Sequence, residues 1–182
     1  MNEIQKFCNI ARKRSEENEN AFKILYQANL YGQTISVLRQ EIDTLVRILF
    51  LLNQPVKTRT ELISQTFEGK KWKIGKTQIT DKVMVDLADK LNGWTENVYK
   101  FGCGFIHLSN FHDYQNENIF EKLEEDDKNN IINYLNTYHG FRFENELSTK
   151  SIIPYLPKIF DKIRGNLECY IEYLEKNKKY ID

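Results

Sequence analysis

Apolar side chains recur every three or four positions along most of the chain, which is the spacing that places them on one face of an α-helix. The longest such stripe lies between Ala21 and about Asn53 and consists of Ile24, Leu25, Ala28, Tyr31, Ile35, Leu38, Ile42, Leu45, Val46, Leu49 and Leu52. Gly32 lies within this pattern, and the low helix propensity of glycine predicts a bend or a break there. Pro55 predicts the end of the helix, because the residue before a proline disfavours the helical conformation.

Shorter stripes predict further helices on both sides of the long one. They cover Glu3–Arg14, a segment from Thr58 or Thr60 to Thr66, Asp81–Asn92 between Thr80 and Gly93, Asp127–Tyr138 before Gly140, and a last helix that starts at Ser148 or Thr149. Pro154 and Pro157 fall in the first turns of this last helix, where a missing backbone N–H costs least. The polar residues Ser15–Asn20 predict a loop after the first helix.

The least regular stretch is residues 69–80, where the sequence KKWKIGK predicts a loop or a small hairpin. Glycine and proline are otherwise few, with 8 and 3 residues in the whole chain, which favours long helices over a sheet with many turns. The pattern therefore predicts an all-α fold, a helical bundle of about five to six helices. We expect residues 1–182 to form a single helical domain with this irregular basic loop at about 69–80.

The segment Trp94–Tyr114, WTENVYKFGCGFIHLSNFHDY, has apolar or aromatic residues on more than one side of a helix. A helix that is covered on all sides lies inside its protein, so this segment is predicted to be one central helix. It also carries Lys100, Cys103, His107 and His112. Because imidazoles titrate near neutral pH, this segment is the predicted location of function.

On such a helix, Lys100 and His107 stand two turns apart on the same face. Cys103 and His107 have the spacing of a nucleophile and its base, although no third residue is evident to orient the base. Gly102 and Gly104 flank Cys103, and two glycines inside a helix predict close packing by another helix, a second subunit or a ligand. The structural alternatives are a helix crossing within the core and a core histidine with ordinary hydrogen bonds.

A second group of polar residues lies on the long helix. Arg39, Asp43 and Arg47 follow one another at intervals of four residues and therefore share a face. They form either an ion-pair ladder or a cationic wall that holds an anion, such as a phosphate, beside His107. The predicted phosphate- or ligand-binding residues are Arg39, Arg47, Asp43, Cys103 and Tyr114.

Charge is distributed unevenly along the chain. Residues 57–82 carry seven basic and three acidic side chains, a net charge of +4, whereas residues 113–127 carry one basic and seven acidic side chains, a net charge of −6. Trp72 lies among Lys70, Lys71 and Lys73, and an aromatic ring beside cations is one means of binding single-stranded nucleic acid. The alternative is a solvated loop with Trp72 packed on the bundle. The acidic segment is interpreted as a solvated face, as a complement to the basic loop of a neighbouring molecule, or as a loose site for divalent ions without the spacing of a calcium loop.

The overall composition limits the classes of partner. Lys and Arg total 26 and Asp and Glu total 26, so the formal net charge is zero, whereas proteins that bind polyanions usually have a basic excess. The three cysteines are far apart and predict neither a disulfide framework nor a Cys-x-x-Cys metal site. His107 and His112 are five residues apart, which does not align two imidazoles on one helical face. We therefore expect no metal and no cofactor.

The sequence predicts neither a secretion signal nor a membrane span. The N-terminal sequence MNEIQKFCNI contains no apolar core of signal-peptide length. The strongest apolar run, Val46–Leu52, is much shorter than the roughly 20 residues that span a bilayer. Free cysteines suit a reducing compartment, so the sequence predicts a cytoplasmic protein without a membrane partner.

Two segments together resemble the HEPN-like family of small helical bundles. They are LRQEIDTLVRILFLL in the long helix and VYKFGCGFIHLSNFH in the segment that follows later. The motif of that family is an arginine, four to six residues, and then a histidine, and here Lys100 and His107 are separated by six residues. The resemblance implies a homodimer of the kind found in bacterial toxin–antitoxin or phage-defence systems. Active members cleave RNA without a metal.

The lysine at position 100 leaves two hypotheses about function. Lysine lacks the planar fork with which arginine binds a phosphate in two places, so the first hypothesis is a non-catalytic interaction or regulatory module with an RNA or protein partner. The alternative is a metal-independent endoribonuclease. In that case His107 would act as general acid or base, and Lys100, with Arg39 or Arg47, would stabilise charge on the scissile phosphate.

Overall fold

The computed structural model of the protein describes residues 2–142 and 146–176, and this part of the chain is predominantly helical. Its helices are α1 (Glu3–Gln27), α2 (Tyr31–Leu52), α3 (Val56–Phe67), α4 (Asp81–Asn92), α5 (Thr95–Ile106), α6 (Glu125–His139), the short α7 (Thr149–Ile152) and α8 (Leu156–Glu175). The prediction of an all-α helical bundle is confirmed. No helix in the described ranges is both long enough and apolar enough to cross a membrane.

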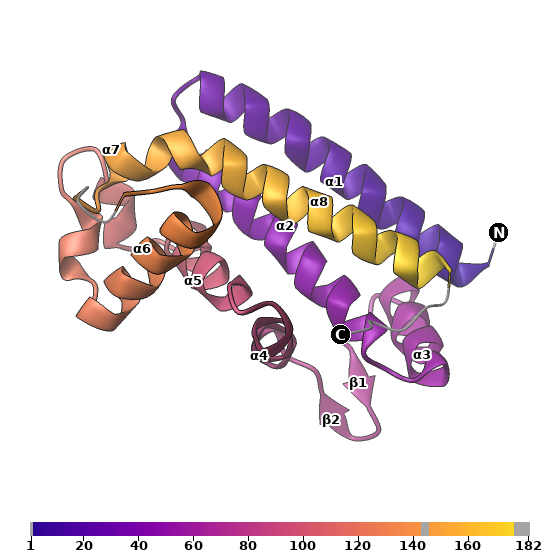
Figure 1. The fold of residues 1–182 in the computed structure, drawn as a ribbon. Helices are drawn as coiled ribbons and strands as arrows, with labels where there is room; N and C mark the ends of the chain where they lie inside the picture. Colours follow the sequence, from indigo (N-terminus) through magenta and orange to yellow (C-terminus); the bar gives the residue numbers. More distant parts are fainter. Residues whose placement is uncertain (1, 143–145, 177–182) are drawn as a thin grey trace.

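The central helix of the bundle is α2, not the segment that follows Trp94. Of its 22 residues, 15 are buried, because α2 packs against α1, α4, α5 and α8. Figure 1 shows α1, α2 and α8 running lengthwise beside one another, with α5 and α6 at one end and α3 with the hairpin at the other. Leu45, Val46 and Ile48 are each 0% exposed, so the stripe predicted from the sequence occupies the middle of the core.

Helix α1 continues through residues 15–20, where the sequence predicted a loop. Ser15 and Asn18 are buried, and both donate hydrogen bonds to the carboxylate of Glu41 in α2; the Asn18 bond is 2.8 Å long. Glu41 itself is 0% exposed, and a buried carboxylate is costly unless donors surround it. Ser15 and Asn18 therefore form a polar contact inside the bundle, while Glu16, Glu17 and Asn20 lie on the exposed side of the same helix.

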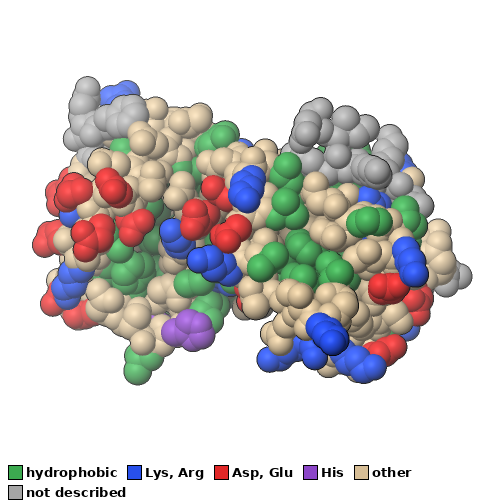
Figure 2. All heavy atoms as spheres, turned by 90° about the horizontal axis from the view of Figure 1, so that it is seen from below, with side chains coloured by type: hydrophobic (Ala, Val, Ile, Leu, Met, Phe, Trp, Pro, Cys, Tyr) green, Lys and Arg blue, Asp and Glu red, His purple; other side chains and the backbone are tan. Residues whose placement is uncertain are grey.

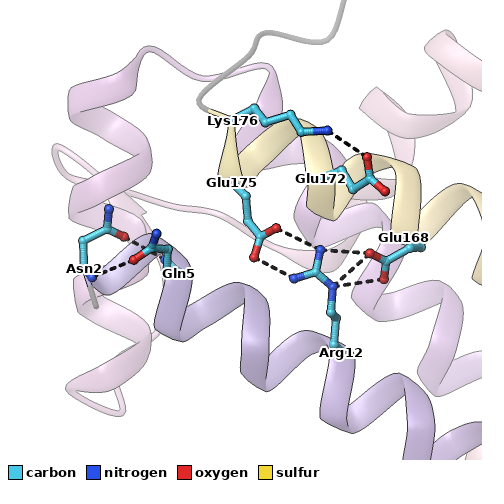
Figure 3. Close-up of polar contacts among 7 residues, drawn as sticks. All are labelled: Asn2, Gln5, Arg12, Glu168, Glu172, Glu175 and Lys176. Carbon is cyan, nitrogen blue, oxygen red and sulfur yellow. Dashed lines mark hydrogen bonds and ion pairs between the residues drawn. The ribbon is translucent and has the colours of Figure 1, made fainter.

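Arg12 joins α1 to α8 on the surface of the bundle. Figure 3 shows its guanidinium between two carboxylates of α8: Glu168 accepts from Nε at 2.9 Å and Glu175 accepts from Nη1 at 2.6 Å. The hydrogen bonds from Arg12 lower the pKa of Glu175. Nearby, Asn2 and Gln5 form reciprocal hydrogen bonds that cap the first turn of α1 (Figure 3), as expected for a capping box.

The chain breaks between α1 and α2 at residues 28–30, slightly before the glycine that predicted the break. Asn29 has a φ of +58°, a left-handed conformation that asparagine tolerates better than most residues. Gly32 lies within the first turn of α2. A Cβ atom there would be 3.3 Å from the Tyr114 ring, so the glycine permits a close approach and does not end the helix.

Helix α2 ends before Pro55, as predicted, and α3 begins directly after this proline and slightly before Thr58. Arg59 of α3 is 0% exposed and points back at the end of α2. Its Nη2 donates to the Leu52 carbonyl at 2.6 Å and its Nε to the Gln54 carbonyl at 2.9 Å. Burial lowers the pKa of Arg59, while the carbonyls left free at the end of a helix favour a cation.

Several predicted boundaries are confirmed. Residues 73–78 form a small antiparallel hairpin of β1 (Lys73–Ile74) and β2 (Thr77–Gln78). Thr80 caps α4 through its side chain, and Gly93 ends α4 in the left-handed conformation. Gly140 does the same for α6.

The last predicted helix also begins where the sequence predicts. Ser148 caps α7, and Pro154 and Pro157 lie in the first positions of the next two helical segments. The chain therefore enters α8 through a short α-turn and a 3-10 turn, η3 (Ile153–Tyr155).

The helix predicted over 94–114 is wrong beyond residue 106. α5 ends at Ile106, His107 is extended with φ −104° and ψ 148°, and a 3-10 turn, η1 (Asn110–Asp113), follows. The Ser109 hydroxyl donates to the Gly104 carbonyl at 2.6 Å, which satisfies one of the carbonyls that a helix end leaves free. The chain thus folds back over the end of α5.

Candidate functional site

The two glycines of α5 do mark close packing, as the sequence predicted. A Cβ atom at Gly102 would be 2.7 Å from Cβ of Arg39 in α2, and one at Gly104 would be 2.2 Å from the Phe111 ring. Real Cβ atoms do not approach other atoms so closely, since overlap of this size forces backbone shifts. Another helix therefore lies against Gly102, and the returning chain lies against Gly104. Neither a second subunit nor a ligand is needed to explain them.

Arg39 forms the centre of the α2–α5 contact. Its guanidinium carbon lies 3.3 Å from the centroid of the Tyr99 ring, and its Nε donates to Sγ of Cys103 at 3.4 Å. Its Nη1 is 3.7 Å from the Asp43 carboxylate. Burial raises the pKa of Tyr99 to about 12. Arg39 and Cys103, both predicted for the anion site, are brought together in a packed cluster in which the guanidinium faces a ring.

Tyr99 was missed in the sequence analysis. It lies four residues before Cys103 and therefore on the same face of α5. This spacing was a usable signal, but the sequence offered no reason to pair that face with Arg39.

The ion-pair ladder on α2 is present. Asp43 lies between Arg39 and Arg47, and Nε of Arg47 is 3.0 Å from the Asp43 carboxylate. Arg47 also contacts Asp81 of α4 at 2.8 Å. Because each arginine has a carboxylate partner, this face joins α2 to α4. It has the character of the ladder and not of a cationic wall for an anion.

The predicted catalytic pair does not share a helical face. Lys100 is exposed on α5 and pairs with Glu96 at 2.8 Å. His107 lies beyond the end of α5, exposed on the extended segment, and no described residue holds a hydrogen bond to its ring. The spacing of four residues between Cys103 and His107 likewise loses its meaning, since only the first is helical.

Tyr114 connects the segment after α5 to the start of α2. Its hydroxyl accepts a hydrogen bond from the backbone N–H of Gly32 at 3.3 Å, and its ring packs near that of Phe105, 5.9 Å between centroids. The residue therefore ties the returning segment to the first turn of α2. His112 also serves this turn, because its Nδ1 accepts from the Ser109 N–H at 3.3 Å.

Trp72 does not have an open face for a base. Its side chain is 6% exposed, its indole N–H donates to Oγ1 of Thr66 at 2.7 Å, and its ring stacks on Phe50 with 6.2 Å between centroids. The alternative of a tryptophan packed on the bundle is therefore correct, and the predicted stacking role is wrong because the ring is part of the core.

The lysines around Trp72 remain on the surface. Lys70, Lys71 and Lys73 are exposed, and Lys70 pairs with Glu68 at 2.6 Å. Seen from below, Figure 2 shows basic side chains in blue around the end of the molecule that carries the hairpin, and acidic side chains in red at the end that carries α6. Some acidic side chains also lie beside the basic ones at the hairpin end, so the two kinds of charge are only partly separated in space (Figure 2).

Among the residues that the structure describes, no three or more His, Cys, Asp or Glu side chains are grouped so that they could hold a metal ion. The three cysteines are free, with Cys8 buried, Cys103 partly exposed and Cys169 exposed. Burial raises the pKa of Cys8 to about 12, which makes this thiol a poor nucleophile.

Comparison with protein-family models, with curated proteins and with solved structures gives no match to this chain.

Proposed function

We propose that the protein is a HEPN-like, non-catalytic interaction module that associates with a second copy of itself. The proposal depends on one observation: Leu108, at the tip of the segment after α5, is 96% exposed. Leaving a leucine in water forgoes roughly 1.5–3 kcal/mol of burial energy. Burial against a partner recovers that energy.

The exposed leucine is held in place and does not stand alone. Directly after it, the Ser109 hydroxyl donates to the Gly104 carbonyl at 2.6 Å and accepts from the Phe111 N–H at 3.1 Å. Ile106, two residues before Leu108, is 45% exposed. We call Ile106 and Leu108 the apical patch.

Several features favour association over catalysis. Lys100 and both arginines of the ladder already have carboxylate partners, so their charges are neutralised locally. His107 lies in the chain between Ile106 and Leu108, and all three side chains are exposed. A histidine at the rim of an apolar contact can fix register between subunits. The all-α bundle is compatible with the HEPN-like resemblance.

The test is sedimentation velocity over a range of protein concentrations. We expect the wild type to shift from monomer to dimer as concentration rises, and Leu108→Asp to remain a monomer with an unchanged circular dichroism spectrum. Val83→Asp is the matched control, because Val83 is 44% exposed on α4, away from the patch, and should dimerise like the wild type. A wild type that stays monomeric at every concentration would overturn the proposal.

A parallel measurement separates this proposal from the ribonuclease expectation. Mixed RNA is incubated in EDTA with wild type and with His107→Ala. We expect no cleavage by either protein. Cleavage by the wild type that His107→Ala abolishes would establish the ribonuclease instead.

A further inference from the structure

A polar hollow lies between two segments that are far apart in the chain. Its volume is about 290 Å³. One wall is the segment from Tyr114 to Asn118, which precedes the 3-10 turn η2 (Ile119–Lys122), and the other consists of Glu146 and residues 148–150 at the start of α7. Small-molecule sites measure about 300–1,000 Å³, so the hollow has the size for a small ligand such as a monosaccharide.

Asn118 joins the two walls of this hollow. Its side-chain amide donates to the Leu147 carbonyl at 3.2 Å and to the Glu146 carboxylate at 3.4 Å. Its side-chain carbonyl accepts from the backbone N–H of Phe120 at 3.3 Å. The walls are thus linked by hydrogen bonds before any ligand binds, and a preformed site loses less conformational entropy on binding.

Thr149 is the buried polar residue at this hollow. It lines the hollow and is 8% exposed. Its hydroxyl oxygen is buried and has no hydrogen-bond partner among the residues that the structure describes. An unsatisfied buried hydroxyl costs free energy, which a ligand that bonds to it recovers.

The side chain of Thr149 has to turn for this bond to form. Because its hydroxyl oxygen is covered, the surface that it presents to the hollow consists of other atoms. Threonine has two favourable rotamers in a helix, and a change between them moves the hydroxyl to another staggered position. Rotation of one side chain can therefore bring the hydroxyl to a ligand in the hollow.

The neutral side chains of the walls match a ligand with several hydroxyl groups. The amides of Gln115 and Asn116 can both donate and accept hydrogen bonds, as can the hydroxyl of Ser148. Asn116 uses one N–H for the Asp113 carboxylate at 2.6 Å, which leaves its carbonyl oxygen available. Hydroxyl groups of a ligand also donate and accept, so they can pair with each of these groups.

The charges at the hollow do not favour an ionic ligand. Glu117, Glu146 and Lys150 line it, and Lys122 forms an ion pair with Glu117. Two carboxylates and two lysines therefore balance. An ion entering the hollow would lose its hydration without meeting a net opposite charge, whereas an uncharged ligand avoids this cost.

Tyr114 adds an aromatic ring to the walls. The ring is fixed, because its hydroxyl accepts a hydrogen bond from the Gly32 N–H. A pyranose sugar has C–H groups on its faces, and their contact with an aromatic ring buries apolar surface.

We propose that this hollow binds an uncharged monosaccharide. The Thr149 hydroxyl and the amides of Gln115 and Asn116 bond to its hydroxyl groups, and the Tyr114 ring contacts its C–H groups. The site is separate from the apical patch and does not depend on association of the protein.

The first test is titration with D-glucose, D-mannose and D-galactose, followed by the backbone NMR signals of Gln115, Asn116, Ser148 and Thr149. We expect saturable shifts of these signals with at least one of the three sugars. D-glucuronate, which carries a charge, should bind about threefold or more weakly than that sugar, because its carboxylate must be desolvated.

Thr149→Val tests the hydroxyl, since valine has nearly the same shape without it. The Kd of the sugar should rise about three- to tenfold, the value of one hydrogen bond. The stability of the unliganded variant in urea should not fall, because the hydroxyl that it loses has no partner. Thr44→Val is the matched control: Thr44 is also 8% exposed, lies in α2 and donates to the Gln40 carbonyl, so this variant should bind the sugar like the wild type.

A second variant blocks the hollow from the surface. Gln115 is exposed, so Gln115→Trp should fold and should abolish sugar binding by filling the hollow. Gln78→Trp, at an exposed position of the hairpin, should leave the Kd unchanged. Circular dichroism of each variant checks the fold.

The proposal is overturned if none of the three sugars shifts the signals of the two walls, or if Thr149→Val binds the sugar like the wild type. A loss of stability in unliganded Thr149→Val would also overturn it, since the hydroxyl would then have a partner in the protein. Tighter binding of D-glucuronate than of every neutral sugar would overturn the assignment of an uncharged ligand. Leu108→Asp should bind the sugar with the wild-type Kd, so failure of the proposed association and failure of this site are distinguishable.

Discussion

Two regions of the molecule are held together in different ways. The lengthwise layer of α1, α2 and α8 buries long apolar stripes, with Ile42, Leu45, Ile163 and Ile171 each 0% exposed. The turn after α5 instead depends on side chains that lie directly on glycine backbone, above all Phe111 on Gly104. The first region has many redundant contacts, whereas the second depends on a few that must be in place together.

The largest expected effect concerns the lengthwise layer. Ile163→Ala removes a side chain that is 0% exposed in α8 and should lower the free energy of unfolding by about 3 kcal/mol, from lost burial and the cavity left behind. Urea unfolding monitored by circular dichroism gives the value. Ile24→Ala is the control, because that side chain is 66% exposed on α1 and should cost less than about 0.5 kcal/mol. Equal losses in the two variants would contradict this view of the layer.

A single methyl group should have nearly as large an effect in the second region. Gly104→Ala places a Cβ atom 2.2 Å from the Phe111 ring, so the ring must move, and we expect a loss of about 2 kcal/mol. Hydrogen exchange should locate the change in residues 106–114. In the double variant with Phe111→Ala, the clash is absent and the additional cost of Gly104→Ala should vanish. If that cost persists, the ring is not its cause.

His139, at the end of α6, adds a pH dependence that belongs to neither of these two regions. Burial, and then the charges of Lys162 and Lys158, lower the pKa of His139 to about 4 from the ordinary value of 6.5. Because the unfolded chain takes up this proton first, the free energy of unfolding should fall as the pH drops from about 6.5 to about 4. After allowance for solvent screening we expect a loss of about 1 kcal/mol.

His139→Gln removes this contribution, so its stability should fall less over the same pH interval than that of the wild type. NMR titration of the His139 ring should give a midpoint near pH 4. A midpoint near 6.5 would show that the ring is solvated in the folded protein.

The smallest expected effect is a gain. Gly165 lies in the middle of α8, and a Cβ atom there would have nothing within 4 Å. Gly165→Ala should therefore raise the free energy of unfolding by about 0.5–1 kcal/mol through helix propensity alone. The opposite signs expected for Gly104→Ala and Gly165→Ala in the same urea experiment separate backbone contact from propensity.

The same contrast explains which elements could be predicted from the sequence. Pro55, Thr80, Gly93 and Gly140 act on their own neighbours along the chain, and each boundary that they predicted is present. The apolar stripe of α2 could be predicted equally well, because periodicity is a local property of the sequence.

The errors come from contacts between distant parts of the chain. Ser15 and Asn18 resemble loop residues until Glu41, more than 20 residues away, is placed between them. The end of α5 depends on Phe111 returning to Gly104, which no helical period can indicate.

The candidate site was predicted only in part, for the same reason. Arg39 and Cys103 of the predicted anion site meet because both project from recognised helices, but their contact is packing between α2 and α5. The pairing of Lys100 with His107 assumed a helix that continues past Ile106, and it fails with that helix. Trp72 lies in the core, because burying a large aromatic ring is strongly favourable. The neighbouring lysines instead suggested an exposed ring.

Arg59 has a consequence for how sequences like this one can diverge. The Leu52 carbonyl at the end of α2 and the Gln54 carbonyl in the turn after it both accept from one buried guanidinium, and a lysine has a single nitrogen with which to serve both. A change at position 59 would need to occur together with a redesign of the Pro55 turn. Descendants of an ancestral chain should therefore exchange these positions as a unit or retain both.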